Sequence, residues 1–229
     1  MQLSKNREQF RITIQGEIAM TNKPQIISLD GDWQFAYTQH GPESNDMTLP
    51  PLHAYEVLMP VPGYWDDHTD RLQYAKFWSR DCRFNPEYRH ISFPMGAGKP
   101  PDASLPYILG TGWYRKQFVA ETDWKDGTVT LRVGGVSLEA WVWLNEQFIG
   151  HHVGHLTPFE MRLDEWLKPG ESNELIIAVA NTRNDRKGTS IRGFQGKSAG
   201  IYRSVELKLS GHTRIKDCYV RTNQTMQEL

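Results

Sequence analysis

Charge of one sign, long apolar runs and cysteine are all scarce in this chain. Its 26 basic and 27 acidic residues leave a net charge of −1, with no long run of either sign. Nucleic acid or an anionic membrane surface would require a positive field, so neither partner is expected. Stretches of about 18 apolar residues and the apolar core of a signal peptide are absent. We therefore expect a soluble chain, either cytoplasmic or exported after removal of a signal.

Cysteine occurs twice among the 229 residues, as Cys82 and Cys218. The two lie far apart in the sequence and form either a disulfide or two buried thiols. So small a number favours unpaired core cysteines over a disulfide framework. The length fits one all-β core.

Alternation of apolar and polar residues, the period of a half-buried strand, dominates what is present. The alternating segments are 128–133, 175–179 and 204–209. Two further apolar runs, Trp141–Leu144 and Phe148–Val153, flank a short polar break at 145–147, which predicts a hairpin. A helix is predicted only over 163–167, with Asp164 as its cap and Gly170 as its stop.

Five segments, in this order, carry a resemblance to a known family. They read LDGDWQF at 29–35, VPGYWDD at 61–67, GTGWYRKQF at 110–118, EAWVWLNEQFIGHHVG at 139–154 and GFQGKSAGIYRSVEL at 193–207. Together they resemble the N-terminal sugar-binding domain of glycoside hydrolase family 2, which includes β-galactosidases and β-glucuronidases. The resemblance implies an all-β jelly-roll β-sandwich, galactose-binding-domain-like, over 26–211. An N-terminal extension at 1–25 would precede it, and 212–229 would begin a truncated immunoglobulin-like domain.

The function implied by this resemblance is that of a non-catalytic part of a larger enzyme. The parent would hydrolyse terminal β-linked sugars with retention, using two glutamates of a later barrel domain. The present chain would bind carbohydrate, pack on the barrel and immunoglobulin-like domains, lend a loop to the substrate pocket and contribute to contacts in a homo-oligomer. The alternatives are a self-sufficient carbohydrate-binding module, favoured by an exposed aromatic platform, and a structural spacer, favoured by a large apolar patch.

No catalytic pair is evident in the sequence. Retaining glycosidases place two carboxyl groups about 5 to 5.5 Å apart. The family marks its acid/base with an Asn-Glu dipeptide, which recurs here as 145–146 and 173–174. The first lies in the predicted turn and the second just before a strand, so turn chemistry explains both. Asp66 and Asp67 are neighbours that point to opposite sides of an extended chain. The chain alone is therefore expected to be inactive.

A histidine cluster has the residue types of a metal site. On a continuing strand His151 and His152 face opposite ways, and His155 shares a side with His151 at a distance of about 13 Å. Zinc needs ligand nitrogens about 2.0 to 2.1 Å from one centre. Unless Gly154 folds the chain back, surface variation explains the cluster better, and no metal or cofactor is expected.

Candidate sugar contacts lie in loops at one end of the predicted sandwich. Saccharides are bound by aromatic faces and by planar amide, carboxylate or guanidinium groups, and residues 181–186 (NTRNDR) supply such groups. In β-galactosidases of the family an Asp of the corresponding loop holds the terminal sugar, and the resemblance gives that position to Asp185 or Asn184. Arg192 and Gln195, in the glycine-rich loop, are further candidates. Solvated or backbone-capping loop residues are the alternative for all four.

Two features bear on specificity. Some β-galactosidases of the family carry a substrate-contacting Asn where this chain has Leu109, which argues against lactose cleavage. The insertion 68–107 carries a set of aromatic residues, Tyr74, Phe77, Trp78, Tyr88 and Phe93. These either rebuild the pocket wall or, as we favour, serve a core or an interface.

Overall fold

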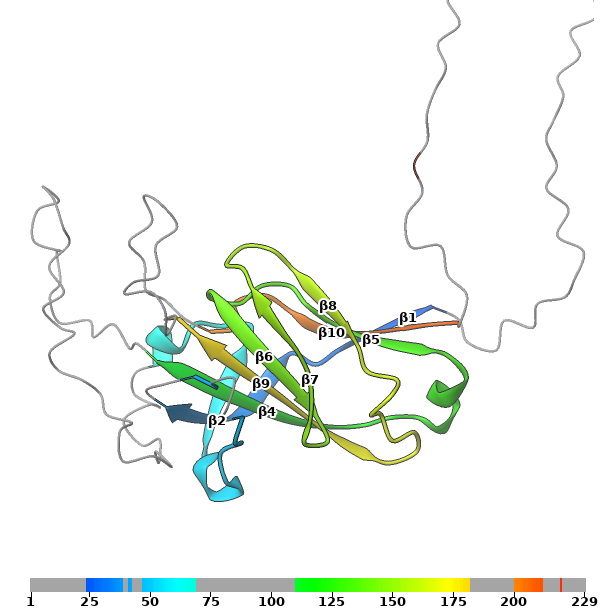
Figure 1. Cartoon of the computed structure of the whole chain (residues 1–229), viewed down its shortest axis with the longest axis horizontal. Helices are drawn as coiled ribbons and strands as arrows, with labels where there is room; N and C mark the ends of the chain where they lie inside the picture. Colours follow the sequence, from blue (N-terminus) through cyan, green and yellow to red (C-terminus); the bar gives the residue numbers. More distant parts are fainter. Residues whose placement is uncertain are drawn as a thin grey trace, which may run out of the picture.

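Two antiparallel sheets form the computed structural model, which describes residues 24–38, 41–42, 47–68, 110–181, 200–211 and 219 (Figure 1). The four-stranded sheet contains, in spatial order, β1 (Gln25–Ser28), β10 (Val205–Ser210), β5 (Thr128–Val133) and β8 (Phe159–Arg162). The six-stranded sheet contains β3 (Val57–Val61), β2 (Gly31–Thr38), β4 (Thr111–Val119), β9 (Ser172–Ala180), β6 (Glu139–Leu144) and β7 (Gln147–Val153). Every pairing between these strands is antiparallel. The predicted all-β jelly-roll sandwich is confirmed.

Helix contributes little to the described part of the chain. Its helical elements are the short 3-10 helices η1 (Leu52–Ala54), η2 (Trp65–His68) and η4 (Thr122–Asp126). Among the described residues, none of the helices is long and apolar enough to cross a membrane.

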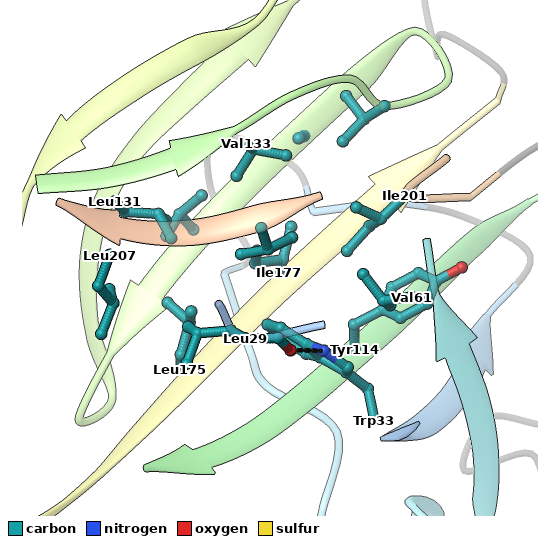
Figure 2. Packing of buried hydrophobic residues seen from close by; sticks show 14 of the residues in the cluster. Leu29, Trp33, Val61, Tyr114, Leu131, Val133, Leu175, Ile177, Ile201 and Leu207 are labelled. Atoms are coloured by element: carbon teal, nitrogen blue, oxygen red, sulfur yellow. Dashed lines mark hydrogen bonds between the residues drawn. The ribbon is translucent and has the colours of Figure 1, made fainter. Parts of the chain in front are cut away.

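The core lies between the two sheets and follows the alternation read from the sequence. Leu131 of β5 pairs with Leu207 of β10, and both are fully buried beside Leu175 of β9 (Figure 2). Trp33 is also fully buried, and its indole Nε1–H donates to the carbonyl of Leu29 at 2.9 Å, so its one polar atom is satisfied. Truncating such a tryptophan to alanine costs about 3 to 5 kcal/mol, so this cluster contributes strongly to stability.

The outer faces of the two sheets differ in character. Ion pairs cover the four-stranded sheet, where Arg132 meets Glu206 at 3.2 Å and Lys208 meets Glu160. The six-stranded sheet instead carries a second buried apolar cluster on strands β2, β4, β6 and β9 and on the β2–β3 connection. Its members are Ala36, Ala54, Tyr55, Trp113, Trp141, Trp143, Ile176, Ala178 and Ala180, with Met47 and Leu49 packed against them. The β2–β3 connection therefore serves as a third layer over this sheet.

The predicted hairpin is confirmed as β6–β7, closed by a two-residue turn. Asn145 and Glu146 have φ angles of 51° and 68°, the left-handed pair of a type I′ turn. The Asn145 side chain is held in place: Nδ2 donates to the Trp166 carbonyl and to Asn173 Oδ1, both at 2.8 Å, and Oδ1 accepts the Glu174 N–H at 3.0 Å. The turn is thereby fixed to the start of β9.

The predicted helix over 163–167 is wrong, because these residues form a single turn. Leu163 is fully buried and accepts N–H donors from Trp166 and Leu167 at 3.1 and 3.0 Å, which closes one turn only. Asp164 is not a helix cap; its Oδ1 accepts the N–H of Val129 in β5 at 2.8 Å. Gly170, at a φ of 81°, lies in a second turn, which the Glu171 N–H closes on the Lys168 carbonyl at 3.2 Å before β9. Tertiary contacts to the sheet replace the hydrogen bonds that would extend a helix.

Candidate functional site

The described residues that border the stretches 69–109 and 182–199 gather at one end of the sandwich. These are His68, Gly110, Asn181 and Gly200. Figure 1 shows the end of β9 beside the start of β4 at the left, with η2 close by. β1 and the end of β10 lie side by side at the right, where Gln25 pairs with Leu209. We call the left side, with its four border residues, the loop end.

The predicted sugar-contact residues lie in these bordered stretches. Asp185, Asn184, Arg192 and Gln195 belong to 182–199, outside the described residues. Leu109, both cysteines and the aromatic residues of the 68–107 insertion are outside them as well. The structure therefore describes the residues that border these two stretches and not the candidate contacts themselves.

Asn181 joins the borders of the two stretches. Its side-chain Oδ1 accepts the N–H of Gly110 at 2.9 Å, and its own N–H donates to the Gly110 carbonyl at 3.2 Å. Asn181 is 1% exposed, so these bonds are shielded from water. Gly110 has a φ of 154°, and a Cβ there would lie 2.3 Å from the Tyr37 hydroxyl. We call this pair of hydrogen bonds the Asn181–Gly110 clamp. It requires a buried side-chain amide at position 181 and a glycine at position 110.

A second junction forms at the glycine that ends the glycine-rich loop. Gly200 has a φ of 146°, and a Cβ at this position would lie 2.4 Å from the Gly63 carbonyl oxygen. The Gly200 carbonyl accepts the N–H of Ser137 at 3.1 Å, and the Ile201 carbonyl accepts the N–H of Gly63 at 2.8 Å. Three connections, after β3, before β6 and before β10, are therefore bonded to one another at the loop end.

Aromatic rings line this junction. Tyr202 and Tyr64 are stacked, with ring centroids 5.3 Å apart and planes 19° from parallel, and His155 lies tilted at 5.7 Å from Tyr202. The Tyr202 hydroxyl donates to the His155 carbonyl. Burial raises the pKa of Tyr202, which keeps that donor protonated, and burial lowers the pKa of His155. Arg203 brings a positive charge to this junction, with its guanidinium carbon 5.9 Å from the Tyr202 centroid.

The three histidines are held apart by separate contacts. His151 stacks on Trp141 at 4.9 Å, and its Nε2 lies 2.8 Å from Glu139 Oε1. His152 stacks on a different ring, Phe159, at 4.4 Å. Strand β7 ends at Val153, so the pattern does not continue to His155. Within the described residues, no group of at least three His, Cys, Asp or Glu side chains is placed to hold a metal ion.

The two Asn-Glu dipeptides occupy structural positions. Asn145 and Glu146 form the β6–β7 turn described above, and Glu146 is exposed. Asn173 is buried, and its amide bonds to the Lys168 backbone on both sides, at 2.8 and 2.9 Å. Glu174 pairs with Arg115 Nε at 2.7 Å. These glutamates are thus in a turn and in an ion pair.

Sequence reasoning missed the stacked pair Tyr64 and Tyr202 as site residues. Each lies within a segment that carries the resemblance, directly after VPG for Tyr64 and after AGI for Tyr202. A signal was available, since a tyrosine close to a glycine turn is placed where backbone crowding is low and a ring can be presented. Their contact joins residues 138 positions apart (202 minus 64), so no local pattern predicts it.

Comparisons with known proteins agree on one family. The model of the sugar-binding domain of glycosyl hydrolases family 2 matches residues 26–210. A β-galactosidase of Priestia megaterium is 26% identical over 200 residues, which is 86% of this chain and 18% of the relative. A β-galactosidase of Thermoanaerobacter pseudethanolicus is 36% identical over 110 residues, 47% of this chain and 15% of the relative. The chain thus spans less than a fifth of these curated relatives.

Solved structures share the fold. A β-glucuronidase of Faecalibacterium prausnitzii superposes with a TM-score of 0.55 at 24% identity, over 82% of this chain and 32% of that one. An uncultured Clostridium sp. β-glucuronidase gives 0.53 at 22% identity, over 82% and 29%.

Proposed function

Because the chain belongs to the family of glycosyl hydrolase family 2 sugar-binding domains, we propose that it is the non-catalytic, carbohydrate-binding part of a longer retaining glycoside hydrolase. The small share of each relative that it covers supports a partial role. Residues 26–211 would be the sugar-binding domain, after an extension at 1–25. Residues 212–229 would begin an immunoglobulin-like domain, with the catalytic barrel further on. The substrates would be terminal β-linked sugars, as the names of the relatives suggest.

The observation that carries this proposal is the convergence of both candidate stretches on the loop end. The Asn181–Gly110 clamp holds the start of one stretch against the end of the other. Asp185 follows Asn181 by four residues, so it can extend at most about 14 Å from this anchor. A fixed starting point limits where the following residues can reach, which suits them to complete a neighbouring pocket. Asp185 or Asn184 would hold the sugar, with Arg192 and Gln195 as further contacts.

A chain of this kind would lack hydrolytic activity by itself. Several described carboxylates have structural partners, such as Glu139 with His151 and Glu206 with Arg132. We expect no turnover of aryl β-galactosides or β-glucuronides above background. Hydrolysis that disappears in a Glu146→Gln variant would contradict the non-catalytic role.

The decisive experiment uses the full-length parent enzyme. Removing one hydrogen-bonding partner of a substrate costs about 1.5 to 3 kcal/mol when the group is charged. Asp185→Ala, or Asn184→Ala if the loop aligns one residue earlier, should lower kcat/KM about ten- to a hundredfold without changing the Tm. If neither variant alters turnover, the chain is a structural spacer. If this chain alone binds a monosaccharide at micromolar strength in calorimetry, it is a self-sufficient module.

A further inference from the structure

Tyr64 is half of a stacked aromatic pair at the loop end. The Tyr202 ring lies against Gly135, where a Cβ would come within 2.9 to 3.1 Å of three of its atoms. Tyr64 stacks on Tyr202 at a centroid distance of 5.3 Å, with the ring planes 19° apart. Within the described residues Tyr202 is the one ring that Tyr64 contacts, and Tyr64 is partly exposed. Among the described residues, one face of the Tyr64 ring therefore has no aromatic partner.

The position of Tyr64 is fixed by backbone bonds on both sides. The preceding residue, Gly63, donates its N–H to the Ile201 carbonyl at 2.8 Å, and the Tyr64 carbonyl accepts the N–H of Asp67 at 3.2 Å. A Cβ on Gly200 would lie 3.2 Å from the Tyr64 Cα, so this backbone packs on the glycine-rich loop's last residue. A ring held in this way pays little conformational entropy when a ligand stacks on it.

We propose that Tyr64 is a saccharide-stacking residue, whose free ring face receives the C–H face of a pyranose bound at the loop end. An aromatic face carries negative quadrupole density, which attracts weakly positive C–H groups. Arg203 lies beside the Tyr202 ring, and a guanidinium can supply hydrogen bonds to sugar hydroxyls. This inference rests on the proposed carbohydrate-binding function and adds a contact to it, separate from the 182–199 loop.

Phe148 provides a matched comparison elsewhere on the molecule. It is 44% exposed on the edge strand β7, where it lies opposite Trp143, close to the β6–β7 turn and away from the loop end. Its ring is tilted 58° to that of Trp143, so it does not extend a stack. An exposed aromatic ring that is not at the loop end should have no part in sugar binding.

The test titrates this chain with methyl β-galactoside and methyl β-glucuronide to about 50 mM, followed by nuclear magnetic resonance, because the expected Kd is millimolar. An aromatic stacking contact is worth a factor of roughly two to ten in affinity. Tyr64→Ala and Tyr64→Leu should weaken binding by that factor. Tyr64→Phe, which keeps the ring, and Phe148→Ala should bind like the wild type. Tyr64→Leu retains apolar contact with Tyr202 and guards against a folding artefact, checked by circular dichroism.

The outcomes separate this inference from the proposed function. If the wild-type chain binds a glycoside and Tyr64→Leu binds it equally well, the stacking role is refuted and the sugar-binding function stands. A Tyr64→Phe variant as weak as Tyr64→Ala would also refute stacking, since it would assign the effect to the hydroxyl. If the wild-type chain binds neither glycoside, the stacking role is refuted, whereas the proposed function is still judged by the Asp185→Ala and Asn184→Ala variants of the full-length enzyme.

Discussion

Replacing Asn145 with alanine tests how strongly one turn residue supports the larger sheet. Its side chain makes three hydrogen bonds, to Trp166, Asn173 and Glu174. Each contributes about 0.5 to 1.5 kcal/mol net. Alanine must also adopt a φ of 51°, which costs about 1 kcal/mol. Because some of the freed groups will regain water, we expect a loss of about 2 to 4 kcal/mol in unfolding free energy, or about 5 to 15 °C in Tm.

The assay is equilibrium unfolding in urea, followed by the fluorescence of the eight tryptophans. Two glycine variants separate the contribution of the hydrogen bonds from the cost of the left-handed backbone. Asn145→Gly loses the same hydrogen bonds but relieves the left-handed strain, so it should be about 1 kcal/mol more stable than Asn145→Ala. Glu146→Gly should stabilise the protein by up to about 1 kcal/mol, because Glu146 is exposed and has a φ of 68°. Each hydrogen bond typically contributes about 1 kcal/mol, so an Asn145→Ala variant whose unfolding free energy is within about 0.5 kcal/mol of the wild-type value would refute this reasoning.

Further predictions concern the core and the histidines. Gly112→Ala should unfold the protein or lower its Tm by several degrees, because a Cβ there would lie 2.4 Å from the Trp65 ring, and differential scanning calorimetry measures this. Burial lowers the pKa of His152. As the pH falls below about 6.5, the unfolded chain therefore takes up a proton before the folded chain does, and stability should fall. A His152→Phe variant should show a smaller drop in Tm between neutral and acidic pH; an unchanged pH profile would contradict this assignment.

The fold could be predicted because its signals are local. Residues 128–133 and 204–209 alternate because one face of each strand is buried. The turn at Asn145 could be predicted because Asn tolerates the left-handed backbone conformation. The helix prediction at 163–167 failed because Leu163 and Asp164 bond to the sheet, a tertiary contact that a single segment does not reveal.

The residues that border the candidate site could be predicted only in part. The sequence indicates that Asn181 is a polar residue in the segment 181–186, but its bonds to Gly110 span 71 positions and no local pattern reveals them. The stack of Tyr64 on Tyr202 and the separation of His151 from His152 by different rings also depend on distant partners. For the loop residues Asp185, Asn184, Arg192 and Gln195, the expectation from sequence remains a prediction.

The loop end and the β1–β10 end lie on opposite sides of the molecule, so the β1–β10 end is a suitable place to attach a label. β10 carries the chain away from Gly200 for six residues, about 20 Å at 3.3 Å per residue. A biotin or a fluorescent protein attached next to β1 or β10 would therefore sit remote from Tyr64 and Asn181. A protein immobilised through the β1–β10 end would present its loop end to the solution. This orientation suits glycan arrays and force measurements on single sugar chains.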